Sequence, residues 1–341
     1  MEDIDKIVLY QRNYFKTMKT QDYNFRKHQL EMLYQKIKHY QKEIEQALYS
    51  DLKKPAFEAY STEIGFVLNS IRFIQKNLKK WMKPHKKLSP YYLFGSYDTV
   101  TYRPLGISLI IGPFNYPFQL VMEPLIGAIA SGNCAIVKPS ENAPSTAKII
   151  KLIIDETFAS EYIYCILGDS IITATLTHSS VDHIFFTGSI EVGKKVMLAA
   201  SEQLIPVTLE LGGKSPVIID DSAVLKDAVE KIAWGKILNA GQTCIAPDYL
   251  IITENLKDEF IELWKVTIEK FLCKDDYGRI VNEKHFNRLI KYLNEEQIYA
   301  GGNYNKDDLW IQPTLVNGDK SNYMVEEIFG PILPIVTYNN R

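Results

Sequence analysis

Short apolar runs alternate with stretches of helical periodicity through much of this chain. The runs typical of buried strands lie at 106–111, 134–137, 162–167, 183–186, 217–219 and 249–253. Residues 146–158 and about 224–238 have the apolar spacing of helices, and Asp220, Asp221 and Ser222 are predicted to cap the second of these. Strands that alternate with helices form a parallel sheet with helices on both faces. We therefore predict an α/β fold with doubly wound sheets.

The length of 341 residues is more than one hydrophobic core usually supports, because single cores stop growing at about 250–300 residues. Two domains are therefore expected. The apparent boundary lies near residues 208–213, and we predict one domain over 1–209 and a second over 210–341. Residues 5–49 have the periodicity of at least two antiparallel helices, and a third helix is predicted at about 58–81. Pro84 and Pro90 end that pattern, so the segment at about 83–103 is predicted to be a hinge or bridge.

Basic and acidic residues nearly balance, with 39 of the former, 41 of the latter and a formal net charge of −2. No global field therefore attracts nucleic acid or an anionic membrane, and a small ligand is expected. The basic stretch 76–87 fits either a patch for nucleic acid or lipid headgroups, or a solvated helix end followed by a linker; we adopt the second interpretation. No stretch has the roughly 18 apolar residues of a membrane span, and residues 1–11 contain no signal-peptide run.

The cysteines and histidines favour a reducing compartment and no metal. The four cysteines are far apart and form no CxxC pair, so the cytoplasm is the expected location. The six histidines are scattered and no HExxH motif occurs, so no metal site is expected. We interpret three cysteines as buried structural residues, namely Cys134, Cys165 and Cys273.

The fourth cysteine, Cys244, has a distinctive setting. It lies in the small-residue loop Asn239–Pro247 (NAGQTCIAP), between a predicted helix and a predicted strand. Gly241 permits close backbone approach, and the amides of Thr243–Ile245 lie beside the sulfur. Cys244 is therefore either a structural cysteine or a nucleophile on a loop, the place where catalytic side chains are often found.

Two further polar residues lie in apolar settings. Glu210 stands between two leucines in 209–216 (LELGGKSP), as either a surface carboxylate at a strand end or a general base with a raised pKa. The glycine pair behind it predicts that another group approaches the backbone there. Asn115, in 112–117 (GPFNYP), either stabilises that turn or donates its amide to a developing oxyanion. The residues alone leave these alternatives open.

Six segments together resemble the aldehyde dehydrogenase superfamily, and most of all its class 3 branch. They are the three just described with Lys138–Ser145 (KPSENAPS), Phe185–Gly193 (FFTGSIEVG) and Glu326–Pro331 (EEIFGP). Their order and separations match the family across essentially the whole chain. The resemblance implies two Rossmann-like doubly wound domains, an NAD(P)-binding domain at 1–209 and a catalytic domain at 210–341, with a bridging and oligomerisation segment at about 83–103.

The resemblance also implies roles by position and a reaction. Cys244 matches the family nucleophile, Glu210 the general base and Asn115 the oxyanion donor. The residues that match its cofactor contacts are Lys138 and Glu141 at the adenosine ribose, Gly188 and Ser189 at the pyrophosphate, and Glu327 and Phe329 at the nicotinamide ribose and ring. The implied reaction oxidises an aldehyde to a carboxylate with NAD(P) through a thiohemiacetal and a thioester. Because Glu141 would repel the 2′-phosphate of NADP, NAD is the expected cofactor and NADP the second candidate.

The chain ends at Arg341, shortly after the EEIFGP segment, so the resemblance implies that the catalytic domain is truncated. Two functions are therefore weighed: an aldehyde dehydrogenase, and a cofactor-binding remnant with little or no dehydrogenase activity. A homodimer is implied, with Tyr97–Arg103 contributing, although a partner strand is expected in the missing part. Medium-chain aliphatic or aromatic aldehydes are the expected substrates.

Two rival enzyme classes share parts of this pattern. Gly188–Lys194 (GSIEVGK) fits most of the phosphate-binding loop of a P-loop NTPase. However, Lys195 stands where Ser or Thr would bind magnesium, and no strand-end aspartate follows. The same geometry serves a dinucleotide pyrophosphate at a helix N-terminus. The family branch that passes the acyl group to coenzyme A shares the cysteine, but Glu210 favours water as the acceptor.

Overall fold

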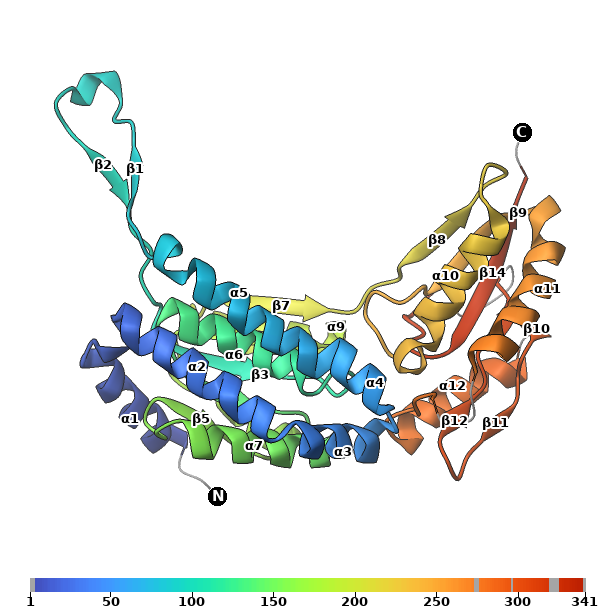
Figure 1. Ribbon diagram of the computed structural model, residues 1–341, viewed down its shortest axis with the longest axis horizontal. Coiled ribbons are helices and arrows are strands. Elements are labelled where there is room, and N and C mark those ends of the chain that lie inside the picture. The colour runs from blue at the N-terminus through green and yellow to red at the C-terminus, as the bar shows by residue number, and fades with distance from the viewer. Residues whose placement is uncertain (1–3, 273–275, 296, 319–324, 340–341) are drawn as a thin grey trace. The chain divides into compact units, whose positions relative to one another are not determined.

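The computed structural model describes residues 4–272, 276–295, 297–318 and 325–339. The chain divides into two compact units, coloured along the chain in Figure 1. Unit 1 comprises residues 1–44 and 60–210, and unit 2 comprises residues 45–59 and 211–341. Residues 45–59, which lie inside the predicted N-terminal domain, group with unit 2.

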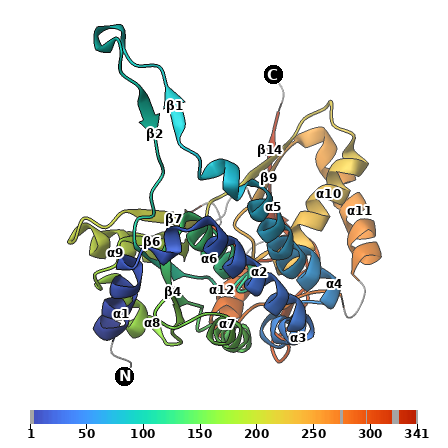
Figure 2. The same ribbon diagram turned by 60° about the vertical axis from the view of Figure 1, so that its left-hand side comes forward.

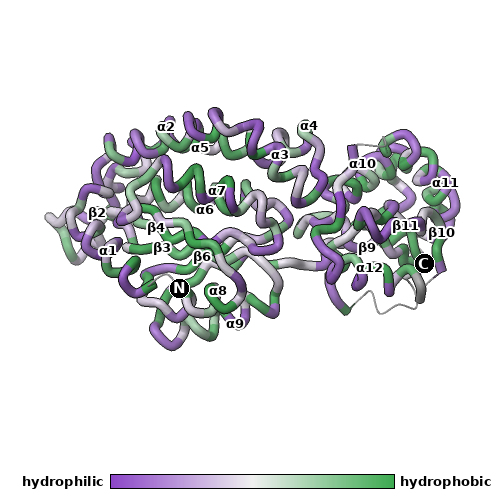
Figure 3. Tube along the Cα trace, turned by 90° about the horizontal axis from the view of Figure 1, so that it is seen from below, coloured by the Kyte–Doolittle hydropathy of each residue, from purple (hydrophilic) through white to green (hydrophobic). Residues whose placement is uncertain are grey.

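Unit 1 is built on a five-stranded sheet in the order β5-β4-β3-β6-β7. These strands are β3 (Ile107–Ile111), β4 (Cys134–Lys138), β5 (Ile163–Cys165), β6 (His183–Gly188) and β7 (Val207–Leu211). β3 pairs in parallel with β4 and with β6, and β4 pairs in parallel with β5. Every residue of β3 and β4 is buried, as expected for strands covered on both faces. Figure 3 shows the hydrophobic character of β3, β4 and β6.

Four helices connect these strands: α6 (Gln119–Ser131), α7 (Pro144–Thr157), α8 (Ser170–Thr177) and α9 (Ile190–Ser201). α6 packs on β3 and β4, and α7 packs on β5, whereas α8 packs on β3 and α9 on β6. The chain reverses its direction across the sheet after β5. Because strand–helix–strand crossovers are right-handed, α6 and α7 cover one face and α8 and α9 the other. The predicted doubly wound α/β fold is therefore confirmed.

The N-terminal region is helical, as its periodicity predicts. Its helices are α1 (Ile4–Lys16), α2 (Tyr23–His39), α3 (Gln41–Leu52), α4 (Ala56–Ala59) and α5 (Gly65–Trp81). α1 packs on β3 and β4, and α2 and α5 pack on α6. A short π-helix, Tyr60–Ile64, interrupts the helix predicted at about 58–81. Among the described residues, no helix combines the length and the apolar character that crossing a bilayer requires.

The predicted bridging segment contains a two-stranded ribbon. β1 (His85–Lys87) pairs antiparallel with β2 (Asp98–Val100), and a short 3₁₀-helix, Tyr91–Leu93, lies between them. Figure 2 shows this ribbon standing away from the sheet of unit 1. Large apolar side chains of the ribbon and its tip are exposed, among them Leu88, Tyr91, Phe94 and Tyr97.

Unit 2 contains a second five-stranded sheet, in the order β10-β13-β14-β9-β8. The strands are β8 (Pro216–Ile219), β9 (Tyr249–Thr253), β10 (Ile298–Ala300), β13 (Thr314–Asn317) and β14 (Ile332–Tyr338). β8, β9, β14 and β13 run parallel, and β10 joins β13 antiparallel. A separate two-stranded ribbon is formed by β11 (Tyr304–Asn305) and β12 (Trp310–Ile311). The strands predicted at 217–219 and 249–253 are confirmed as β8 and β9.

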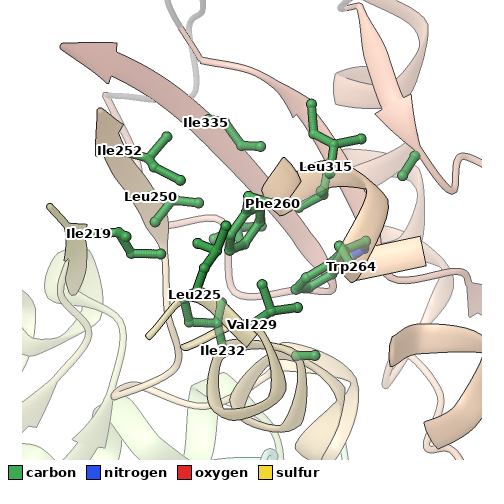
Figure 4. Close-up of a cluster of buried hydrophobic side chains, with 14 of the residues drawn as sticks. Ile219, Leu225, Val229, Ile232, Leu250, Ile252, Phe260, Trp264, Leu315 and Ile335 are labelled. Atoms are coloured by element: carbon green, nitrogen blue, oxygen red, sulfur yellow. The ribbon is translucent and has the colours of Figure 1, made fainter. Parts of the chain in front are cut away.

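Three helices accompany this sheet: α10 (Leu225–Ile237), α11 (Glu254–Phe271) and α12 (Glu283–Glu295). α10 packs on α11, and α11 packs on β9, β10 and β14. Figure 4 shows the core that results, with Phe260 and Trp264 of α11 pointing toward Val229 of α10 and Leu250 of β9. A second core contains Phe286 and Leu289 of α12.

The prediction that Asp220, Asp221 and Ser222 cap α10 is wrong. The helix begins at Leu225, and its N-cap residue, Val224, makes no side-chain capping bond. Asp220 instead accepts hydrogen bonds from the amide of Ser222 at 3.0 Å and from its hydroxyl at 2.6 Å. Asp220 and Ser222 thus form a turn that ends before the helix starts at Leu225. The side chains of this turn are too far upstream to bind the free amides of the helix.

Candidate active site

The predicted site residues of unit 1 follow the carboxyl ends of neighbouring parallel strands. β3 lies between β4 and β6, and Ile111 at its end is in register with Lys138 of β4 and Phe186 of β6. The chain leaves β3 toward β4 and later returns on its other side at β6. Parallel sheets bind their ligands in the crevice outside the carboxyl ends of the strands at such a reversal point.

Asn115 lies between β3 and α6 and is 3% exposed. Its loop is fixed by Glu63, a fully buried carboxylate presented by the π-helix. Glu63 accepts hydrogen bonds from the amides of Phe118 at 2.9 Å and Gln119 at 3.2 Å, at the start of α6. A carboxylate is favoured there by the free amides and by the dipole of the helix. Nothing in the sequence pattern identifies Glu63.

Lys138, the last residue of β4, is buried and forms an ion pair with the exposed Glu141. Gly188 ends β6, and Ser189 caps α9 by accepting a hydrogen bond from the amide of Val192 at 3.4 Å. A helix N-terminus suits a pyrophosphate, and a carboxylate beside an ammonium suits ribose hydroxyls. This donor set at one sheet edge therefore fits a dinucleotide. Glu210, in the neighbouring strand β7, is exposed.

The Cys244 loop of unit 2 has an unusual backbone. After α10 ends, Asn239, Ala240 and Gly241 adopt positive φ angles of 51°, 52° and 71°. The buried Gln242 then donates to the carbonyls of Asn239 at 3.0 Å and Arg279 at 2.9 Å. Left-handed non-glycine residues are uncommon, and they occur where the surrounding contacts fix the backbone. The loop that carries Cys244 is therefore a defined turn.

Two of the three cysteines that we interpreted as buried structural residues are indeed buried. Cys134 and Cys165 are buried, and burial raises the pKa of Cys134 to about 12, which makes it a poor nucleophile. Cys244 is half-buried, and none of these three forms a disulfide among the described residues. Cys273 lies outside the described residues.

Two glycines allow the predicted segments of unit 2 to approach one another. A Cβ atom on Gly241 would lie 2.3 Å from the carbonyl oxygen of Gly330, in the EEIFGP segment. A Cβ atom on Gly212 would lie 1.9 Å from a carboxylate oxygen of Glu327, in the same segment. The first distance is to main chain and forbids a side chain at Gly241. The second is to the end of the Glu327 side chain, which would have to move if residue 212 carried a Cβ atom. The prediction of close approach is therefore confirmed at Gly241 and, within the glycine pair after Glu210, at Gly212, whereas a Cβ atom on Gly213 would meet nothing within 4 Å.

The EEIFGP segment shows strain and an unusual electrostatic setting. Phe329 has a φ of 49°, a conformation that bulky residues adopt rarely and mainly at functional sites. Burial raises the pKa of Glu327 above its ordinary value, although the amide of Gly213 opposes the shift. Burial also lowers the pKa of Lys236, on α10, to about 8. Perturbed groups of this kind cluster at functional sites.

The structure thus brings the predicted residues together in two groups, one in each unit. In unit 1, Lys138 and Gly188 are the last residues of β4 and β6, Asn115, Glu141 and Ser189 follow β3, β4 and β6, and Glu210 lies in β7. In unit 2, the loops of Cys244 and Glu327 are in contact through Gly241 and Gly330.

Three residues are missed by the sequence pattern: Glu63, Lys236 and Asp248. Asp248 directly follows the NAGQTCIAP loop and is 3% exposed. A charged residue between that loop and an apolar strand is the one signal that could have identified it.

The two largely parallel sheets and the cysteine loop define a two-unit α/β protein of dinucleotide-binding type. The pattern of the aldehyde dehydrogenase family matches residues 1–341. This chain belongs to the aldehyde dehydrogenase family.

Its curated relatives include members of the class 3 branch. A 4,4′-diaponeurosporen-aldehyde dehydrogenase of Staphylococcus aureus is 51% identical over 336 residues, which is 96% of this chain and 73% of the relative. The dimeric NADP-preferring aldehyde dehydrogenase of mouse is 39% identical over 343 residues, covering 98% of this chain and 76% of the relative. Aldehyde dehydrogenase family 3 member A2 of mouse is 42% identical to this chain.

Solved structures show the same fold. A substrate-bound AldH of Staphylococcus aureus matches with a TM-score of 0.97 and 49% identity, over 100% of this chain and 76% of that chain. A betaine aldehyde dehydrogenase of Staphylococcus aureus in complex with NAD+ matches with a TM-score of 0.89 and 26% identity, over 99% of this chain and 71% of that chain.

Proposed function

We propose that this chain oxidises an aldehyde to a carboxylate with NAD(P), using Cys244 as the nucleophile. The observation that carries the proposal is the Cys244 loop. A half-buried thiol follows three consecutive left-handed residues, and Gly241 brings the EEIFGP segment against the same turn. Strained backbone persists where the surroundings fix it, and pre-organisation of a reacting group is one use of such strain.

In the proposed reaction, the Cys244 thiolate adds to the aldehyde carbon and forms a thiohemiacetal. The side-chain amide of Asn115 and the backbone amide of Cys244 donate hydrogen bonds to the oxyanion that develops. When bound, NAD(P) would supply the acceptor for the hydride that leaves the thiohemiacetal. The Glu210 carboxylate takes a proton from water, whose oxygen attacks the resulting thioester and releases the carboxylic acid and the cysteine thiol.

The proposed cofactor contacts follow the residues that match the family, taken one unit at a time. In unit 1, Lys138 and Glu141 would bind the adenosine ribose, and the N-terminus of α9 at Gly188 and Ser189 would bind the pyrophosphate. In unit 2, Glu327 and Phe329 would position the nicotinamide ribose and ring. The thiol must stay reduced to act, so we also propose a cytoplasmic location, where thiols are kept reduced.

The proposal is tested by mixing the purified chain with NAD+ and a panel of aldehydes and following NADH absorbance. The panel contains medium-chain aliphatic and aromatic aldehydes and the 4,4′-diaponeurosporen-aldehyde named for the 51% identical relative. NADH formation with any of them supports the dehydrogenase. NAD+ binding by fluorescence without NADH formation would favour the alternative, a cofactor-binding protein with little or no turnover.

Replacing Glu141 with glutamine is expected to shift the cofactor preference toward NADP. The carboxylate repels a 2′-phosphate, and its removal leaves the buried Lys138 ammonium to attract that phosphate. The ratio of kcat/KM for NAD to that for NADP should fall by about tenfold, which corresponds to about 1.4 kcal/mol. Steady-state kinetics with both cofactors measures it, with Glu202→Gln as the exposed control in unit 1. An unchanged ratio would remove Glu141 from the ribose site.

We also propose that the chain forms a homodimer to which the β1–β2 ribbon contributes. Its exposed apolar side chains, Leu88, Tyr91, Phe94 and Tyr97, form a surface typical of an association site. Sedimentation velocity is expected to give a dimer, and Tyr91→Ser with Phe94→Ser to shift it toward monomer. A monomer at all concentrations of the unmodified chain would contradict this part of the proposal.

A further inference from the structure

Asp248 is a buried carboxylate that lies four residues after Cys244 and immediately before β9. It is 3% exposed. One carboxylate oxygen forms an ion pair with the ammonium of Lys214, and the other accepts a hydrogen bond from the amide of Ile328 at 2.9 Å. The backbone amide of Asp248 donates to the carbonyl of Ser215 at 2.9 Å. Asp248 therefore contacts two of the other predicted segments, LELGGKSP and EEIFGP.

These contacts fix the backbone on both sides of Glu327. The ammonium of Lys214 donates to the carbonyl of Glu326 at 3.0 Å, while Asp248 binds the amide of Ile328. Arg288 adds a hydrogen bond to the carbonyl of Ile328 at 2.6 Å. With its neighbours bound in this way, Glu327 directs its carboxylate to Gly212, and one carboxylate oxygen lies 1.9 Å from where a Cβ atom of residue 212 would be.

The charges around Asp248 make its carboxylate hard to replace. Lys236, almost fully buried on α10, donates to the carbonyl of Pro247 at 2.7 Å. Asp248 attracts this ammonium as well as that of Lys214. The side chain of Lys236 is almost fully buried and that of Lys214 is 21% exposed. Removing the Asp248 carboxylate would therefore leave the buried Lys236 ammonium, above all, poorly compensated, because removing one partner of a buried pair leaves an uncompensated charge. Asp248 is therefore the anion that pairs directly with Lys214 and attracts Lys236 most strongly, and the Glu327 carboxylate adds a smaller attraction for Lys236.

We propose that Asp248 is a positioning residue that holds Glu327 in the geometry in which its carboxylate binds the cofactor. The inference rests on the proposed function, because it assigns to Asp248 an effect that passes through the proposed role of Glu327. Asp248 touches neither substrate nor cofactor in this account. Its effect is transmitted through the main chain of Glu326–Ile328.

Replacing Asp248 with asparagine tests the inference. The amide keeps an oxygen for the Ile328 amide but removes the charge that pairs with Lys214. We expect the Kd for NAD+, measured by protein fluorescence, to rise by about tenfold, because loss of fixed geometry weakens binding by such factors. The KM for the aldehyde should change little. Asp258→Asn, an exposed change on α11, is the matched control.

Two further variants separate positioning from a general structural effect. Lys214→Met keeps the hydrogen bond between the Ile328 amide and Asp248 but removes the ammonium that binds the Glu326 carbonyl. The Kd for NAD+ should therefore rise, as in Asp248→Asn. Lys214→Arg should restore part of the lost affinity for NAD+. The double variant Asp248→Asn with Glu327→Gln should bind NAD+ no more weakly than Glu327→Gln alone, since residues that act through one another are non-additive.

The outcomes distinguish the inference from the function on which it rests. If Glu327→Gln leaves the Kd unchanged, the cofactor role of Glu327 is wrong. If Glu327→Gln weakens binding but Asp248→Asn and Lys214→Met do not, only the role of Asp248 is overturned. Additive losses in the double variant, or a matching loss in Asp258→Asn, would overturn it as well. A higher Kd in both Asp248→Asn and Lys214→Met, together with non-additive losses in the double variant, supports the inference.

Discussion

Replacing Cys244 with alanine is expected to abolish NADH formation from aldehydes, a loss of about 10⁴-fold or more. The alanine variant has no group that can add to the aldehyde carbon, so no hydride donor forms. The backbone of the loop should survive, because the positive φ angles lie at residues 239–241 and Gln242 makes the fixing bonds. Steady-state NADH production measures activity, and fluorescence titration should show unchanged NAD+ binding.

The control for Cys244→Ala is Cys165→Ala. Cys165 is fully buried in β5, in the interior of unit 1, and should be needed for packing alone. This variant is expected to retain dehydrogenase activity, with at most a modest loss of stability from the small cavity. Activity that survives in Cys244→Ala, or is lost equally in both variants, would show that Cys244 is not the nucleophile.

Replacing Glu210 with glutamine is expected to stop turnover after the first step. Without the carboxylate, water is not deprotonated, and the thioester on Cys244 accumulates. Steady-state turnover should fall by about 10²- to 10⁴-fold, the usual contribution of a general base. A rapid burst of NADH, one equivalent for each active site, should nevertheless remain. Stopped-flow absorbance distinguishes the burst from the slow phase.

The control for Glu210→Gln is Glu202→Gln, a change at an exposed residue of unit 1. This control variant is expected to turn over at the normal rate. If Glu210→Gln loses the burst as well as the turnover, Glu210 contributes before the thioester forms and its assignment to hydrolysis is wrong. If it loses neither, a different group activates water. The exposed position of Glu210 on β7 leaves it accessible to water, as a hydrolytic base requires.

Much of the fold follows from local sequence patterns. The apolar runs predicted the central strands because β3 and β4 are buried on both faces, where a continuous apolar run is required. The strand predicted at 249–253 has the bounds of β9. α6 is not apparent from the pattern, because it is apolar on nearly all sides and contains Pro124, which usually argues against a helix.

The candidate site was predictable where a residue type is chemically unusual, and not where its role depends on partners distant in sequence. Gly241 could be identified because only glycine permits the approach of the Gly330 main chain, and Gly212 because the Glu327 carboxylate lies where its Cβ atom would be. Asp248 and Glu63 are ordinary acidic residues until the fold brings Lys214, Ile328 and the start of α6 to them. Such long-range pairing has no signature in one sequence.

The most direct test of the proposed chemistry is to identify the residue that becomes acylated. The chain is mixed with NAD+ and an aldehyde, quenched with acid during turnover, digested and analysed by mass spectrometry. We expect the peptide that contains Cys244 to gain the mass of the acyl group, and no other cysteine peptide to do so. NADH formation with no acyl group on Cys244, or with the group on another residue, would contradict the account.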